Sequence, residues 1–166
     1  MAQLERKHID FIQKNFRNGL RFRLMLWSQL PMGFSSKMKI KELTDERCQV
    51  TVPYNRKNKN PFNSTFWAVL GMAAEMSSGA MLVQYTYKQK PSVAMLVSDC
   101  HAEFVKKATD VTTFTCNDGL KIRAAIEKTM ETGEPELIEC RMVGTNEAGE
   151  EVTSWIFNWS VKARSK

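Results

Sequence analysis

A long apolar stretch that carries a single charge, residues 60–79, constrains this chain more than any other feature. It reads Asn-Pro-Phe-Asn-Ser-Thr-Phe-Trp-Ala-Val-Leu-Gly-Met-Ala-Ala-Glu-Met-Ser-Ser-Gly. Asn63 and Ser64 are preferred N-cap residues after Pro61, and Gly79 can serve as a breaker near the end of a helix. The stretch therefore predicts a buried helix that is apolar almost all round.

Glu75 is the only charged residue in this stretch. A carboxylate is costly to bury unless it is paired or used, so Glu75 is the first candidate for chemistry. Its neighbours at helical spacing are mostly small, namely Ala68, Gly71, Met72, Ser78 and Gly79. They leave room beside the carboxylate for a ligand or for another backbone. The alternative is a packing helix whose Glu75 points to solvent at an edge.

Length and composition indicate one soluble domain comprising residues 1–166, with 43% hydrophobic and 25% charged residues. No segment offers the roughly 20 apolar residues that span a bilayer. The start of the chain lacks the apolar core of a secretion signal, so we expect a cytoplasmic protein.

Metal ligands are sparse in this sequence. Four cysteines (Cys48, Cys100, Cys116 and Cys140) form no close pair, and the two histidines, His8 and His101, are isolated. Metal sites usually show closely spaced ligands. We therefore expect no metal and no cofactor, and we interpret the cysteines as buried free thiols.

The net charge of +6 suits an anionic partner, although a plain solvated surface would give the same value. The densest basic run is Arg56-Lys57-Asn58-Lys59, directly before the apolar stretch. No RNA-binding signature is present, and the aromatic residues Trp155, Phe157 and Trp159 alternate as in a strand that packs into a core. We therefore expect no nucleic-acid partner.

The remaining periodicities predict more strands than helices. We expect the second helical piece, residues 20–32, to pack against a sheet edge or a pocket mouth. The alternative is a membrane-surface role, because Arg21 and Arg23 lie among its apolar residues. Helices are expected at 3–18, 20–32, 120–132 and, for the apolar helix, up to about 82; strands are expected at 38–43, 48–54, 92–105, 111–116, 136–145 and 151–162. One sheet curled around the apolar helix would bury that helix on nearly every side.

This order of elements resembles the hotdog-fold acyl-CoA thioesterases of the phenylacetate-pathway type, and within them an uncharacterised branch known as a domain of unknown function. The resemblance implies an α+β fold whose antiparallel sheet wraps a long central helix, with residues 1–33 as a helical cover and 34–166 as the core. The family has a loop asparagine, then a His-Gly-Gly that opens the helix, then an acidic residue. Asn60 and Glu75 occupy the first and last of these positions, whereas Phe66-Trp67-Ala68 replaces the tripeptide.

The resemblance also implies a mechanism. Backbone N–H groups near Trp67 or Ala68 would polarise a thioester carbonyl, Glu75 would act as general base or nucleophile, and Asn60 would orient water or the carbonyl. Glu75 lies roughly 13 Å along the helix from Phe66, so two antiparallel chains are needed to complete one site.

We therefore expect a homodimer or a dimer of dimers that hydrolyses acyl-CoA or a similar thioester. The basic residues Arg56, Lys57 and Lys59 would meet the phosphates of coenzyme A, or else form a solvated loop. The alternative function is a catalytically inactive hotdog dimer that binds an acyl chain or another apolar ligand.

Overall fold

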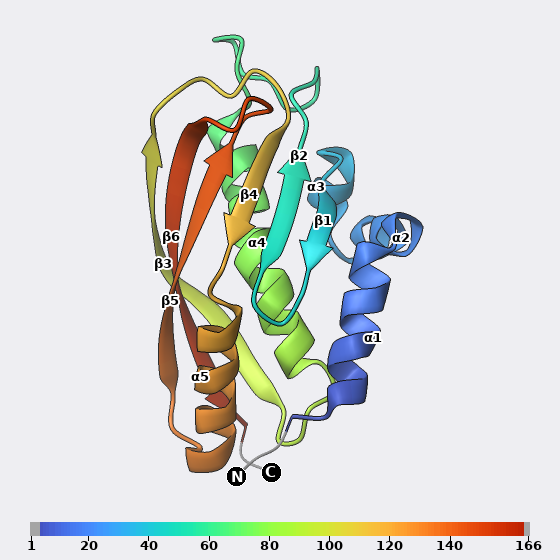
Figure 1. The fold of residues 1–166 in the computed structure, drawn as a ribbon, viewed down its shortest axis with the longest axis vertical. Coiled ribbons are helices and arrows are strands. Elements are labelled where there is room, and N and C mark those ends of the chain that lie inside the picture. The colour runs from blue at the N-terminus through green and yellow to red at the C-terminus, as the bar shows by residue number, and fades with distance from the viewer. Residues whose placement is uncertain (1–3, 165–166) are drawn as a thin grey trace.

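The computed structural model describes residues 4–164 and is built around one antiparallel sheet (Figure 1). Its strands lie in the order β1-β2-β4-β5-β6-β3. Their bounds are β1 Lys39–Leu43, β2 Cys48–Val52, β3 Val93–Phe104, β4 Thr112–Cys116, β5 Glu136–Thr145 and β6 Glu151–Ala163. All six regions were expected to be strands, and the alternating burial of Cys48, Val50 and Val52 on β2 shows why the pattern was informative.

A twenty-residue helix, α4, runs along one face of this sheet, and shorter helices flank it (Figure 1). The helices are α1 Arg6–Arg17, α2 Gly19–Gln29, α3 Pro31–Ser35, α4 Trp67–Thr86 and α5 Gly119–Thr132. Helix α1 contacts α4 and β1, whereas α5 contacts α4, β5 and β6. This is the α+β arrangement expected from the sequence, and α3 spans the expected division between residues 33 and 34.

Small side chains let α4 lie close to the strands. Ala73, Ala74 and Ala80 are fully buried, and so are the larger Met81 and Leu82. On the sheet, strands β2, β4 and β5 supply the large apolar residues of the same core, among them Val50, Phe114, Ile138 and Met142. The apolar character of this helix is therefore explained by burial along most of its length.

Both ends of α4 differ from the sequence expectation. The N-cap is Phe66, without a side-chain hydrogen bond, because Ser64 is engaged in a turn with Asn60 and Asn63 has a positive φ of 58°. Gly79 does not end the helix, which continues to Thr86. The segment beyond residue 82, expected to be a loop, is therefore a further turn of buried helix.

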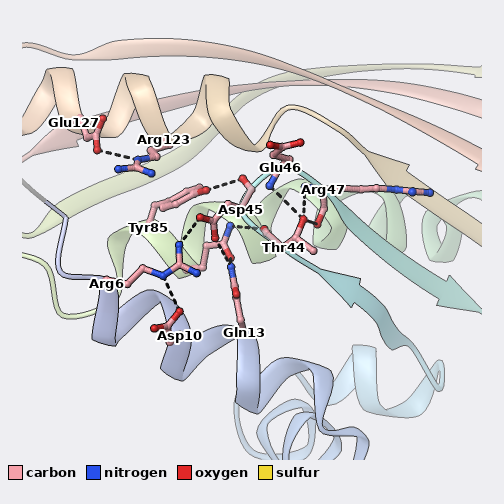
Figure 2. Close-up of polar contacts among 11 residues, drawn as sticks. Arg6, Asp10, Gln13, Thr44, Asp45, Glu46, Arg47, Tyr85, Arg123 and Glu127 are labelled. Atoms are coloured by element: carbon pink, nitrogen blue, oxygen red, sulfur yellow. Dashed lines mark hydrogen bonds and ion pairs between the residues drawn. The ribbon is translucent and has the colours of Figure 1, made fainter.

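A polar network explains why the helix continues. The buried Tyr85 donates to the carbonyl oxygen of Asp45 at 2.6 Å, and the buried Gln84 donates to the carbonyl oxygen of Thr44 at 3.0 Å. Gln13 of α1 donates to Gln84 at 3.1 Å and to the carboxylate of Asp45 at 2.7 Å. Figure 2 shows these groups converging from α1, α4 and the β1–β2 turn, with Arg6 paired to Asp45. These long-range partners are invisible to local sequence periodicity.

Helix α5 buries one side, formed by Ile122, Ile126 and Met130, which lie four apart. The sequence spacing of Leu120 and Ala124 would also suit an inward side, but both residues are exposed.

The four cysteines are free, but they are not all buried as expected. Cys48, Cys116 and Cys140 are buried, whereas Cys100 is exposed because it lies on the edge strand β3. Within residues 4–164 no group of three potential ligands could hold a metal ion, and no helix is long and apolar enough to cross a bilayer.

We expect Tyr85→Phe to lower the free energy of unfolding by about 1–2 kcal/mol, because it leaves the partly buried carbonyl of Asp45 without this donor. Urea denaturation followed by circular dichroism measures this. Tyr87→Phe is the matched control, since Tyr87 is only partly buried and its hydroxyl has no hydrogen bond within residues 4–164. Equal midpoints for the two variants would contradict this account of the network.

Candidate active site

The first turn of α4 presents unpaired hydrogen-bond donors. The loop before it is fixed by Phe66 N–H, which donates to the carbonyl of Asn58 at 2.7 Å, and by Thr65 N–H, which donates to that of Ala108 at 2.8 Å. Within residues 4–164, the N–H groups of Trp67 and Ala68 have no acceptor. The aligned peptide dipoles add a partial positive charge at this end. The start of α4 can therefore bind a carbonyl oxygen or an anion.

A cleft of about 290 Å³ opens beside this helix end. Its walls come from the segment that leads into α4 and from the loop after β3, which meet near the upper end of α4 in Figure 1. The lining residues are Asn60, Ser64, Thr65, Trp67, Leu70, Phe104, Val105, Lys106, Lys107 and Ala108. Two of the predicted site residues, Asn60 and Trp67, thus lie in one cleft.

The side chain of Asn60 shapes the turn that forms this wall. Its oxygen accepts from the N–H groups of Phe62 at 2.9 Å and Ser64 at 3.2 Å, and its nitrogen donates to the hydroxyl of Ser64 at 3.0 Å. An amide nitrogen carries two N–H groups, so one donor is left after this bond. Asn60 therefore holds the loop and still has a donor to offer.

Glu75 lies two turns further along α4 and is partly buried. Burial raises the pKa of its carboxyl above the ordinary value. Gly79, one turn on, makes room for the carboxylate, since a Cβ there would lie 3.1 Å from Oε1. Glu75 is therefore neither fully buried nor freely exposed.

The space at Gly71 is filled by an aromatic ring of the chain itself. A Cβ at Gly71 would lie 2.7 Å from Cη2 of Trp155, so the indole packs directly on the helix backbone. Trp159 donates to the hydroxyl of Ser78 at 3.0 Å, and Trp155 stacks on Phe157 with ring centroids 5.7 Å apart. The aromatic face of β6 is therefore a wall beside the helix face that carries Glu75.

Glu75 and the helix start do not form one site within a single chain. Eight residues separate Trp67 from Glu75, which is about 12 Å along a helix. The cleft at the helix start does not include Glu75 among its lining residues.

The basic residues are placed differently from expectation. Arg56, Lys57 and Lys59 are exposed and do not line the cleft, whereas Lys106 and Lys107 do. Lys106 pairs with Glu150 at 2.8 Å, and the Lys107 amine donates to the carbonyl of Phe62 at 3.1 Å. Sequence reasoning had treated these two lysines as a break between strands. The sequence signal that could have pointed to this cleft is the pair of adjacent lysines directly after Phe104-Val105.

Thr65 is a third cleft residue that sequence reasoning missed. Only 3% of its surface is exposed, and it lines the cleft. Its hydroxyl has no hydrogen-bond partner in the part of the chain that the structure describes. A lone threonine before an aromatic pair gives no sequence signal, since its position depends on the contact with Ala108.

Comparison with known proteins places the chain in a family. Residues 20–161 match a family described as a domain of unknown function (DUF4442), and the chain belongs to it. No curated protein matches the sequence.

Several solved structures with a similar fold are described as thioesterases, whereas a Chlorobaculum tepidum protein with a TM-score of 0.74 is described as having unknown function. A Pseudomonas aeruginosa protein of unknown function, described as a probable thioesterase, shares 16% identity with a TM-score of 0.74, over 90% of this chain and 99% of that one. A Haemophilus influenzae thioesterase shares 12% identity with a TM-score of 0.63, over 84% and 88%. A Staphylococcus aureus thioesterase shares 15% identity with a TM-score of 0.58, over 80% and 98%. At these identities the likeness establishes the hotdog fold, which confirms that prediction.

The raised pKa of Glu75 makes stability depend on pH. The folded state holds the proton more tightly than the unfolded state, so the favourable contribution is complete below the unfolded-state pKa and is lost as pH rises through the folded-state pKa. We expect Glu75→Gln to raise the melting temperature by a few degrees at about pH 8, and by less as pH falls toward about 5.

Differential scanning fluorimetry across this range measures the effect. The control is Glu131→Gln, which makes the same change at an exposed position of α5. A gain that does not vary with pH, or that the control reproduces, would argue against a buried carboxylate.

Proposed function

We propose that this protein hydrolyses acyl-CoA or a related acyl thioester at a site that two copies of the chain build together. The observation that carries the proposal is the presence, on one helix, of a partly buried carboxylate with a raised pKa and of unpaired N–H groups at the helix start. A base and an oxyanion-binding group are the two parts that hydrolysis of a thioester requires. The thioesterase descriptions of proteins with this fold support the same reaction class.

A dimer is proposed because β3 is an edge strand whose inner face is only partly covered. Met95 is 39% exposed and Phe104 is 53% exposed, although both point to the side of the sheet on which α4 lies. An edge strand of twelve residues also offers a row of unpaired backbone groups. Antiparallel pairing of β3 with β3 of a second copy would satisfy those groups and bring a second α4 over the inner face.

The two α4 helices would then run antiparallel. Ala68, Met72 and Glu75 form the partly exposed side of α4, which the sheet does not cover. Placing that side against its own symmetry mate brings Glu75 of one copy toward the helix start of the other. A two-fold axis gives two equivalent sites.

Hydrolysis would follow from this arrangement. Glu75 takes a proton from a water molecule, whose oxygen attacks the thioester carbonyl carbon. The N–H groups of Trp67 and Ala68 of the other copy stabilise the oxyanion. When the C–S bond breaks, the leaving thiolate takes the proton from Glu75, and the products are a carboxylic acid and a thiol. The free N–H of Asn60 would orient the carbonyl, and Lys107, with its amine at the cleft, would meet an anionic part of the substrate.

A catalytically silent binder of an acyl chain is the second candidate. The observation that favours it is Trp67, which is 59% exposed at the position where the family has glycine, and packs edge-on against Phe66. A bulky side chain there narrows the approach of a thioester to the backbone.

We expect Glu75→Gln to lower kcat on acyl-CoA substrates at least about 100-fold, because general base catalysis contributes roughly 10²–10⁴-fold. Thiol release from a panel of acyl-CoAs, from short to long chains, measures the rate. Glu131→Gln, the exposed control on α5, should retain the wild-type rate.

The possible outcomes separate the two candidates. Equal rates for wild type and Glu75→Gln would remove Glu75 from the mechanism. Acyl-CoA binding without turnover by the wild type, measured by calorimetry, would establish the silent binder.

The dimer has its own test. We expect Met95→Glu to convert the wild-type dimer to monomer at micromolar concentration, because it places a charge in an apolar interface. Leu137→Glu makes the same change at an exposed position of β5 and should leave the mass unchanged. Analytical ultracentrifugation gives both masses, and a wild-type monomer would overturn the shared site.

A further inference from the structure

Helix α2 is apolar on two opposite sides. Phe22 and Leu26 are buried against the rest of the chain, whereas Leu20 is 70%, Leu24 56% and Trp27 64% exposed. A helix that is hydrophobic on every side is normally buried on every side. Half of the apolar surface of α2 therefore lacks an apolar environment within residues 4–164.

The exposed residues form a continuous stripe. At 100° per residue, Leu20, Leu24 and Trp27 fall within an arc of about 60° on the helix. Met32, in the first turn of α3 directly after α2, is also 69% exposed. We refer to these four residues as the α2 face.

Arginines flank the stripe on both sides. By the same geometry Arg21 lies to one side of Leu24 and Arg23 to the other. Arg23 lies over the ring of Phe34 at 4.5 Å, and Arg21 donates to the side chain of Asn15 at 3.0 Å. Both are exposed, and in the described chain neither makes an ion pair with a carboxylate. Two arginines held beside apolar residues can meet anionic groups at the level at which those residues insert.

Charge is concentrated in this part of the chain. Between residues 11 and 41 there are seven Lys or Arg residues and no Asp or Glu: Lys14, Arg17, Arg21, Arg23, Lys37, Lys39 and Lys41. The whole chain has a net charge of only +6, so the rest of it is close to neutral. Electrostatic attraction to an anionic surface would therefore orient the molecule with α2 toward that surface.

From these observations we propose that the α2 face docks onto an anionic lipid bilayer surface. Leucine, tryptophan and methionine would enter the boundary between headgroups and acyl chains, while the flanking arginines pair with lipid phosphates. The α2 face is the outer side of an exposed helix and does not line a groove. This shape fits the surface of a bilayer. Figure 1 shows α2 at the opposite edge of the molecule from β3, so the proposed dimer would leave it free.

Vesicle sedimentation with the full chain tests this. We expect binding to phosphatidylcholine vesicles that contain phosphatidylglycerol, much weaker binding to phosphatidylcholine alone, and a decrease as salt rises. Leu24→Glu should lower the partition coefficient at least about tenfold, and each of Arg21→Gln and Arg23→Gln about fivefold. Leu120→Glu, at an exposed leucine of α5, is the matched control and should bind like the wild type.

Tryptophan emission reports on the same face. The wild type should shift to shorter wavelength with anionic vesicles, and Trp27→Phe should lose most of that shift. Circular dichroism confirms that each variant is folded.

Three results would overturn the proposal. Absence of binding to anionic vesicles would leave an acidic protein as the partner of this face. Equal binding by Leu24→Glu and wild type would exclude the α2 face from the contact. A lower oligomer mass for Leu24→Glu without lipid would show that a second copy of the chain covers it. Acyl-CoA hydrolysis in detergent-free buffer is measured separately, so failure here leaves the proposed reaction untouched.

Discussion

The burial of α4 against one face of the sheet is the interaction on which the rest of the structure depends. Other elements hold both ends of this helix. At the C-terminal end the side chains of Tyr85 and Gln84 bond to the β1–β2 turn and to α1. The N-terminal end is held by the backbone of Phe66 and Thr65 but keeps two free donors. The helix is thus held by side-chain hydrogen bonds at its C-terminal end, whereas its N-terminal end keeps N–H groups that can bind a ligand.

Glu75 works against the stability of the helix that carries it. Burial raises the pKa of the carboxyl, so its ionised form is disfavoured in the folded chain. Gly71 and Gly79 also weaken a helix relative to alanine, yet each leaves space that is used, one by the ring of Trp155 and the other by the carboxylate. Gly71, Glu75 and Gly79 thus each lower the stability of the helix within nine residues. Such a concentration fits a functional site better than a purely structural helix.

Local patterns were sufficient for the fold and insufficient for the site. Alternation along β2 and β6 and the apolar stretch predicted six strands and the central helix, because burial on one face imposes a period on the sequence. The end of α4 was misjudged because Tyr85 is buried by Asp45, forty residues away in sequence. Asn60 and Trp67 were singled out through the family resemblance, which aligns them with the loop asparagine and the tripeptide that opens the helix. The cleft lysines were not, because Lys107 reaches Phe62 only through a loop contact.

The two uncovered apolar surfaces have a common geometric origin. Six strands at about 4.8 Å span roughly 24 Å, whereas a helix with its side chains is only about 10–12 Å wide. One helix therefore cannot cover this sheet. Helices α1 to α3 extend the cover beyond β1, and in doing so α2 turns a second apolar side outward. At the other edge the inner face of β3 is only partly covered within residues 4–164, since Val97 and Ala102 pack against the core whereas Met95 and Phe104 are exposed. A second copy can fill the space at β3, because that space continues the side of α4 that carries Glu75. The α2 face has no such continuity with α4 and is flanked by Arg21 and Arg23, so a partner that combines apolar and anionic groups fits it best.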